Sequence, residues 1–175
     1  MNTLVIHPHD RTTEFLSEIY SNKDWTIITK EIPNKEMISL IKSHDRVIML
    51  GRGTPSGMFG FDKVTVGPEL VPSLKEKICI GIWSYADNFF KKYGLSGYAC
   101  GKIVSDNDDA EYHNLIYTTD KVNQSNKILA KSIKLSIDSE NIKESIMGIM
   151  SKYTGNDVIK YNINNIYYVR NSHEY

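Results

Sequence analysis

Short apolar segments alternate with amphipathic segments through the first half of the chain. Residues 3–7, 25–29 and 46–50 are brief runs rich in apolar and β-branched side chains, which predicts strands. Between them, residues 12–20 and 34–43 repeat apolar side chains every three or four positions, which predicts helices. Strands that alternate with helices through short connections are typical of a parallel sheet covered on both faces. We therefore expect an α/β three-layer sandwich with a central, mostly parallel sheet.

The second half continues this pattern and then becomes mainly helical. Residues 78–83 and 98–104 are expected to be strands, separated by a short helix over residues 86–93. No repeat or linker interrupts the chain, so residues 1–175 are interpreted as a single domain. Further expectations are a hairpin around residues 59–66 within an irregular segment 51–72, helices at 109–117, 121–136 and 142–153, and extended segments at 158–161 and 166–169.

Charge and apolar content exclude several classes of partner. The 175 residues contain 21 Lys and Arg against 21 Asp and Glu, so the formal net charge is zero. A balanced chain does not favour nucleic acid or an acidic membrane surface. No apolar run approaches the roughly 20 residues of a membrane helix, and the N-terminus has no basic lead-in of a signal peptide. We expect a cytoplasmic protein, while its oligomeric state stays open.

Candidate chemistry gathers after the predicted strands. Ligands of open α/β sheets bind beyond the carboxyl ends of the strands. The segment Gly51-Arg52-Gly53 follows the third strand, and a guanidinium held between two glycines suits a carboxylate or a phosphate. The glycine spacing fits neither the dinucleotide fingerprint nor a phosphate loop, so no nucleotide cofactor is implied. A tight loop that needs glycine is the alternative interpretation.

Ser84 stands where an exposed nucleophile would lie, after a buried strand and before a helix. A serine needs a neighbouring base, and the candidates are the five histidines. His7 and His9 are expected at the same edge of the sheet as Ser84. The alternative is that Ser84 simply caps the following helix. The candidate histidines are His7, His9, His44, His113 and His173.

No metal site is expected. His7, His9 and Asp10 supply only two imidazoles and one carboxylate, and Asp10 is better explained as a helix cap. The two cysteines, Cys79 and Cys100, lie within predicted strands and are interpreted as core thiols. The acidic residues after the fifth strand lack the glycine of a calcium loop and are interpreted as a solvated helix start. These acidic residues are Asp106, Asp108, Asp109 and Glu111.

Two of these segments carry a family resemblance. Residues 47–53 (Val-Ile-Met-Leu-Gly-Arg-Gly) resemble the strand that ends in Gly-His-Gly in caspase-like cysteine peptidases of the clan CD, CHAT-like group. Residues 80–87 (Ile-Gly-Ile-Trp-Ser-Tyr-Ala-Asp) resemble the following strand, which ends in the nucleophilic cysteine. The likeness extends to small bacterial proteins with a His-Pro-x-Asp-x-Thr-Thr-x-Phe-Leu stretch, here residues 7–16. It implies a caspase-like topology.

The chain departs from this family at the two catalytic positions. Arg52 stands in place of the histidine, and Ser84 stands in place of the cysteine. Arginine stays protonated and is no general base, so the resemblance implies a peptidase-like module that is catalytically inert. Such a module would bind a peptide or a small anionic ligand through Arg52, Ser84, Gly51 and Gly53. His7 would lie at the same edge, and Asp87 would select a basic group.

Two alternatives remain open. One is an active-site-substituted form of a working cysteine peptidase, in which Arg52 and Ser84 replace a histidine and a cysteine. The other is a flavodoxin-like domain that binds a small molecule and has no peptidase ancestry. Its phosphate or flavin loop would follow the first strand, where His7-Pro8-His9 offers little.

Overall fold

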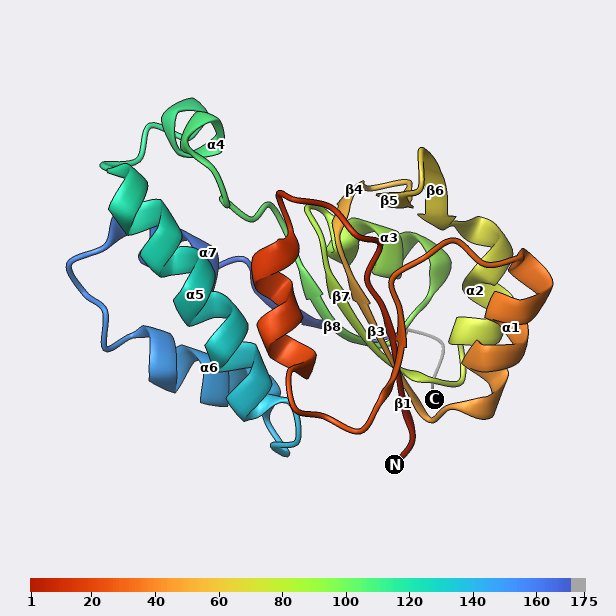
Figure 1. Ribbon diagram of the computed structural model, residues 1–175. Coiled ribbons are helices and arrows are strands. Elements are labelled where there is room, and N and C mark those ends of the chain that lie inside the picture. Colours follow the sequence, from red (N-terminus) through yellow and green to blue (C-terminus); the bar gives the residue numbers. More distant parts are fainter. Residues whose placement is uncertain (171–175) are drawn as a thin grey trace.

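A six-stranded sheet forms the centre of the computed structural model, which describes residues 1–170 (Figure 1). The strand order is β2-β1-β3-β7-β8-β9, in which β9 alone runs antiparallel to its neighbour. The predicted α/β architecture with a mostly parallel sheet is therefore confirmed. The strands are β1 (Thr3–Ile6), β2 (Thr26–Ile28), β3 (Arg46–Leu50), β7 (Ile78–Ile82), β8 (Gly97–Cys100) and β9 (Ile166–Val169).

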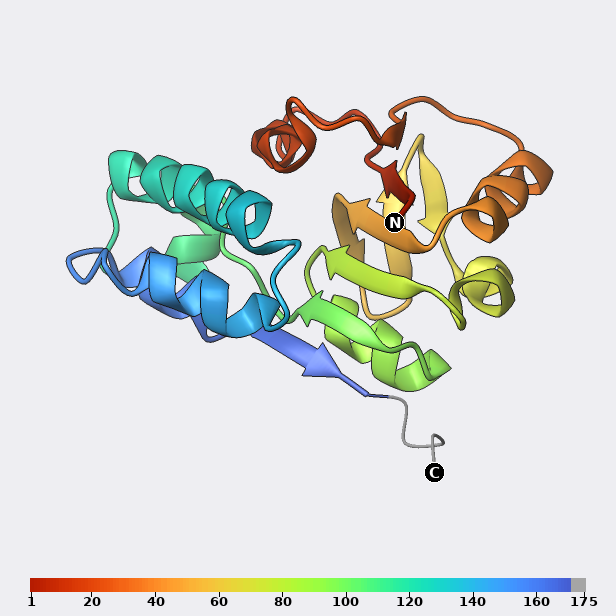
Figure 2. The same ribbon diagram turned by 90° about the horizontal axis from the view of Figure 1, so that it is seen from below.

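Helices cover both faces of the sheet and complete a three-layer sandwich. Figure 2 shows α1, α2 and α3 on one side and η1, α5 and α6 on the other. The helices of the first side are α1 (Asn34–Ser43), α2 (Val71–Leu74) and α3 (Ala86–Tyr93). Those of the second side are the 3-10 helix η1 (Glu14–Tyr20), α5 (Thr119–Ser136) and α6 (Ile142–Met150), with α4 (Asn107–Tyr112) and α7 (Asp157–Ile163) packed beyond them.

The alternation of side chains along each strand divides the hydrophobic core into two parts, one on each face of the sheet. In β3, Val47 and Met49 pack towards α1 and α2, whereas Ile48 and Leu50 pack towards η1 and α5. Successive side chains of a strand point to opposite faces, and both faces of β3 are covered, so every residue of this strand is buried. This explains why the central strands are continuous apolar runs, and it leaves their carboxyl ends as the place for polar residues.

A second, three-stranded antiparallel sheet lies beyond the upper edge of the main sheet (Figure 1). It consists of β4 (Arg52–Thr54), β5 (Gly57–Gly60) and β6 (Lys63–Val66). The predicted hairpin around residues 59–66 is present as β5 and β6. The added strand β4 and the short helices η2 (Pro68–Leu70) and α2 replace the irregular structure expected for the rest of residues 51–72.

Three local expectations are wrong. Residues 158–161 are helical rather than extended, because the Asn156 side chain accepts hydrogen bonds from the first amides of α7. Asp10 does not cap η1; its carboxylate binds the amide and hydroxyl of Thr12 instead. The helix expected over residues 109–117 is shifted and shorter, since α4 covers Asn107–Tyr112 and ends there. The extended segment at residues 166–169 is confirmed as β9.

Within residues 1–170, none of the helices combines the length and the apolar content that crossing a membrane requires.

Candidate functional site

A cavity of about 270 Å³ opens at the carboxyl edge of the main sheet. The segments that follow β1, β3, β7 and β8 all contribute to its wall, and these four strands are consecutive in the sheet. The lining residues are Thr12, Thr13, Phe15, Leu16, Gly51–Pro55, Ile82–Tyr85, Lys102, Ile103, Ser105, Asp106, Asp109 and Leu129. The cavity therefore lies where an open α/β sheet normally binds its ligand.

Arg52 and Ser84 line this one cavity, although 32 residues separate them in sequence. The pairing of β3 with β7 brings their loops together, with Leu50 in register with Ile82 and the Gly51 amide bonded to the Ile82 carbonyl. Gly51 and Gly53 line the cavity as well. Four of the six candidate residues predicted from the sequence thus share one site.

The Arg52 side chain is exposed and has no fixed partner. It makes no hydrogen bond or ion pair with any residue between positions 1 and 170. Its charge helps to lower the pKa of the Asp10 carboxyl, although the Thr12 hydroxyl is the larger cause. The guanidinium is therefore available to an anion.

The backbone beside Arg52 is held firmly even though the side chain is free. A Cβ at Gly53 would overlap the Trp83 ring and lie 2.6 Å from the Gly57 carbonyl oxygen. The Trp83 indole N–H donates to the Thr54 carbonyl oxygen at 3.2 Å. Glycine is needed here because β4 lies against the indole, which fixes where Arg52 leaves the backbone.

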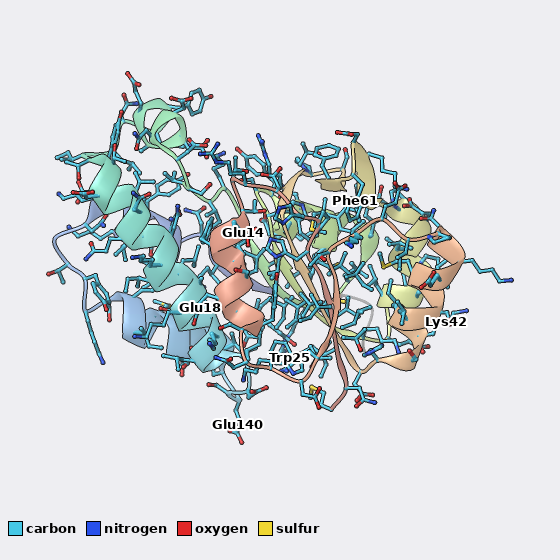
Figure 3. All side chains as sticks on the ribbon, viewed as in Figure 1. Glu14, Glu18, Trp25, Lys42, Phe61 and Glu140 are labelled. Carbon is cyan, nitrogen blue, oxygen red and sulfur yellow. The ribbon has the colours of Figure 1, made fainter. Side chains whose placement is uncertain are left out.

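Arg52 also borders a second, shallower hollow of about 680 Å³ under the small sheet. Phe61 and Asp62 form the turn between β5 and β6, both with left-handed backbone (φ 54° and 58°). Figure 3 shows Phe61 beyond the upper edge of the main sheet. A ligand can therefore reach the Arg52 guanidinium either from the cavity or from this second hollow.

Ser84 begins the sharp turn between β7 and α3. The next residue, Tyr85, has left-handed backbone with φ 68° and ψ 25°, a conformation that costs a residue with a Cβ about 1–2 kcal/mol. The Tyr85 amide is tied to the Gly101 carbonyl at 3.0 Å. The expectation that Ser84 caps α3 is wrong: Tyr85 occupies the capping position, and no side chain caps the helix there. The turn instead places Ser84 in the cavity wall.

The described residues place no histidine in this wall. His7 is buried, its ring nitrogens bonded to Tyr20 Oη at 3.0 Å and Thr13 Oγ1 at 3.3 Å, and burial lowers the pKa of its imidazole. His9 lies against the Glu14 carboxylate at 3.4 Å, outside the cavity. His44 and His113 are absent from the lining too, and His173 lies outside the described residues. His7 therefore touches the site only through Thr13.

Acidic residues and a lysine form the wall opposite Arg52. Lys102 pairs with Asp109 at 2.7 Å, and Asp106 accepts a hydrogen bond from the Asp109 amide at 2.8 Å. The predicted helix start is confirmed, since Asp106 caps α4. The sequence pattern did not indicate that Lys102, Asp106 and Asp109 line the cavity. Because they follow β8, they would have been found had the sheet neighbours of β7 been known.

Asp87 does not fit its expected role. It is buried, and its carboxylate accepts a hydrogen bond from Lys91 at 2.8 Å, one turn along α3. The cavity lining does not include it. A basic ligand group in the cavity would therefore meet Asp106 or Asp109 rather than Asp87.

Neither thiol chemistry nor metal chemistry has support in the described part of the chain. Cys79 and Cys100 are free, buried core thiols as expected, and burial raises the pKa of each thiol to about 12. No three His, Cys, Asp or Glu side chains among residues 1–170 gather so that they would hold a metal ion.

No protein-family model matches the sequence, and no curated protein matches it.

Proposed function

We propose that the protein binds a small anionic ligand, a carboxylate or a phosphate, in the cavity beside Arg52, and that it does not cleave peptides. The observation that carries this proposal is the unpaired guanidinium at the mouth of a cavity on the carboxyl edge of the sheet. Arginine offers two parallel N–H donors that match a carboxylate or phosphate. The Ser84 hydroxyl lines the same cavity and supplies a further hydrogen bond.

The size of the cavity favours a small ligand. Its volume of about 270 Å³ lies just below the range of about 300–1,000 Å³ that is typical of ligand pockets. Water occupies about 30 Å³ per molecule in the liquid, so the space corresponds to about nine waters. A metabolite-sized anion, or the terminal residue of a peptide, fits this space.

The absence of a base beside Ser84 supports inertness. Arg52 stays protonated, and the Lys102 ammonium is engaged by Asp109. No imidazole among the four described histidines lines the cavity. A serine hydroxyl without a base is a weak nucleophile, so the Ser84 hydroxyl is not activated for acyl transfer.

The resemblance to caspase-like peptidases remains part of the proposal. Its two catalytic positions correspond to Arg52 and Ser84, and in such an enzyme these positions must face one another across a shared site. Their common cavity at the ends of adjacent strands β3 and β7 supports this ancestry. A peptidase-like scaffold that lost its dyad and kept its cleft accounts for both the likeness and the substitutions.

Titration with inorganic phosphate and with acetate, followed by NMR chemical shifts, tests anion binding. We expect the largest shifts in the loops after β3 and β7, and binding at least about tenfold weaker in Arg52→Gln, since a charged hydrogen bond contributes about 1.5–3 kcal/mol. Arg11→Gln is the matched control, because Arg11 is exposed and outside the cavity. Equal weakening by both variants would contradict a site at Arg52.

A second candidate function is that of a cysteine peptidase whose dyad has been substituted. The sharp turn at Tyr85, which presents residue 84 to the same cavity as residue 52, favours it. The double variant Arg52→His with Ser84→Cys is then expected to react with an alkylating probe faster than the buried Cys79 and Cys100, and to cleave mixed peptides. An unlabelled residue 84 in a folded variant would overturn this candidate.

A further inference from the structure

The cavity is electrically polarised along the sheet. Arg52 follows β3, Ser84 follows β7, and the acidic group of Asp106 and Asp109 follows β8. The order β3-β7-β8 in the sheet puts two strand spacings, about 10 Å, between the first and the last of these segments. The cavity thus has a cationic side and an acidic side, with Ser84 between them.

Among the side chains that line the cavity, each side carries one net charge. The Lys102 ammonium pairs with Asp109 at 2.7 Å, so these two charges offset one another. Asp106 uses one carboxylate oxygen to accept the Asp109 amide, and no cation pairs with it in the described part of the chain. The acidic wall therefore keeps one negative charge, opposite the one positive charge of Arg52.

Apolar side chains form part of the wall between the charged groups. Ile82, Ile103 and Leu129 line it together with the Trp83 and Phe15 rings. Apolar lining accommodates methylene groups and offers nothing to a second anionic group. A ligand with negative charge at both ends would meet repulsion at Asp106.

We propose that the ligand is bipolar, with a carboxylate or phosphate at Arg52 and an ammonium or guanidinium group at Asp106, joined by a short apolar chain. This inference rests on the proposed anion site and names the class of molecule that fills it: an amino acid with a basic end, an ω-amino carboxylate, or a peptide that ends in such a residue. Asp106 then determines the specificity of the site for the cationic end.

A pair of probes that differ at one end tests the inference. 6-Aminohexanoate and hexanoate share the carboxylate and the chain, but only the first carries an ammonium group. We expect 6-aminohexanoate to bind the unmodified protein up to about fivefold more tightly than hexanoate, since Asp106 is exposed and a pair between exposed charges contributes about that much. Isothermal titration measures both affinities.

The variant Asp106→Asn removes the charge and keeps the capping oxygen, because asparagine caps helices as well as aspartate does. We expect the preference for 6-aminohexanoate to fall to less than about twofold in this variant, with unchanged far-UV circular dichroism. Asp108→Asn is the matched control, since Asp108 is exposed on the same helix and does not line the cavity. An equal loss in both variants would mean that general surface charge, not Asp106, attracts the ammonium.

The outcomes separate this inference from the proposed function. If both probes bind equally and both weaken in Arg52→Gln, the anion site stands and the bipolar ligand is refuted. If Arg52→Gln affects neither probe, the anion site itself fails. Failure of both probes to bind at concentrations up to about 10 mM would overturn both proposals.

Discussion

One arginine begins strand β3 and another follows its end by two residues, and the two side chains have opposite surroundings. Arg46 begins the strand and is only 5% exposed. It donates hydrogen bonds to Thr3 Oγ1 at 3.1 Å, to the Ile137 carbonyl at 3.0 Å and to Asp138 at 2.9 Å. Arg52 follows the strand, is exposed, and makes no such bond to any described residue.

The difference shows that a residue type alone does not decide between a structural and a binding role. Arg46 joins the start of β3 to the end of α5, and its guanidinium stacks over the Trp25 ring at 5.1 Å. Figure 3 labels Trp25 near the lower end of the sheet, opposite the cavity. The Nε and Nη1 donors of Arg46 are bonded within the protein, whereas the side-chain donors of Arg52 bond to none of the described residues. The first arginine holds the fold together, and the second is available for function.

The largest expected effect follows from removing the structural arginine. Arg46→Gln leaves Thr3 Oγ1 and the Ile137 carbonyl without their charged donor, and hydrogen bonds to charged groups contribute about 1.5–3 kcal/mol each. Asp138 is 65% exposed and adds little. We expect the free energy of unfolding to fall by about 3 kcal/mol in urea denaturation. A loss below about 1 kcal/mol would show that the buried guanidinium is not structural.

The second largest effect concerns the backbone that positions Arg52. Gly53→Ala would press a methyl group onto the Trp83 ring and the Gly57 carbonyl, and such overpacking costs about 2 kcal/mol. Gly148→Ala is the control, because nothing lies within 4 Å of its added carbon in helix α6. Alanine there is expected to raise stability by up to about 1 kcal/mol. Equal unfolding free energies for the two variants would show that strand β4 shifts at little cost to accommodate the added methyl group.

The contrast between the two arginines could not have been drawn from the sequence. Apolar runs such as residues 46–50 predicted the strands, because burial on both faces demands continuous apolar character. The hydrogen-bond partners of Arg46 lie 43, 91 and 92 positions away along the chain, and no local sequence pattern predicts them. Asp87 and Asp106 illustrate the same limit, since both follow strands at one edge, but only the strand order and the helix geometry decide which carboxylate reaches the cavity.

Local hydrogen bonds explain why other predictions of secondary structure were wrong. The segment 158–161 has β-branched and aromatic residues that predict a strand, yet the Asn156 side chain initiates a helix by accepting two amide hydrogen bonds. An asparagine followed by an acidic residue was a signal that could have found this helix. The expectation that Arg52 and Ser84 lie near one another depended on β3 and β7 being neighbours, and their pairing in the sheet supplies this.

A smaller effect is expected from acid. Hydrogen bonding to Arg46 lowers the pKa of the Asp138 carboxyl. A carboxyl with a lowered folded-state pKa stabilises the protein above its unfolded value of about 3.9, and this stabilisation is lost as the pH falls through the folded value. Because Asp138 is largely exposed, we expect a contribution below about 1 kcal/mol. Comparing urea denaturation at about pH 5 and about pH 3 should show a smaller loss for Asp138→Asn than for the unmodified protein.

The smallest effect on stability is expected at the arginine that we assign to ligand binding. Arg52→Gln removes no hydrogen bond or ion pair to the described residues, so the free energy of unfolding should change by less than about 0.5 kcal/mol. A ligand that binds only the folded state raises the melting temperature. Phosphate or 6-aminohexanoate should therefore raise it for the unmodified protein and for Arg11→Gln, but much less for Arg52→Gln. If Arg52→Gln were as unstable as Arg46→Gln, the two ends of β3 would share one structural role, and the anion site would lose its basis.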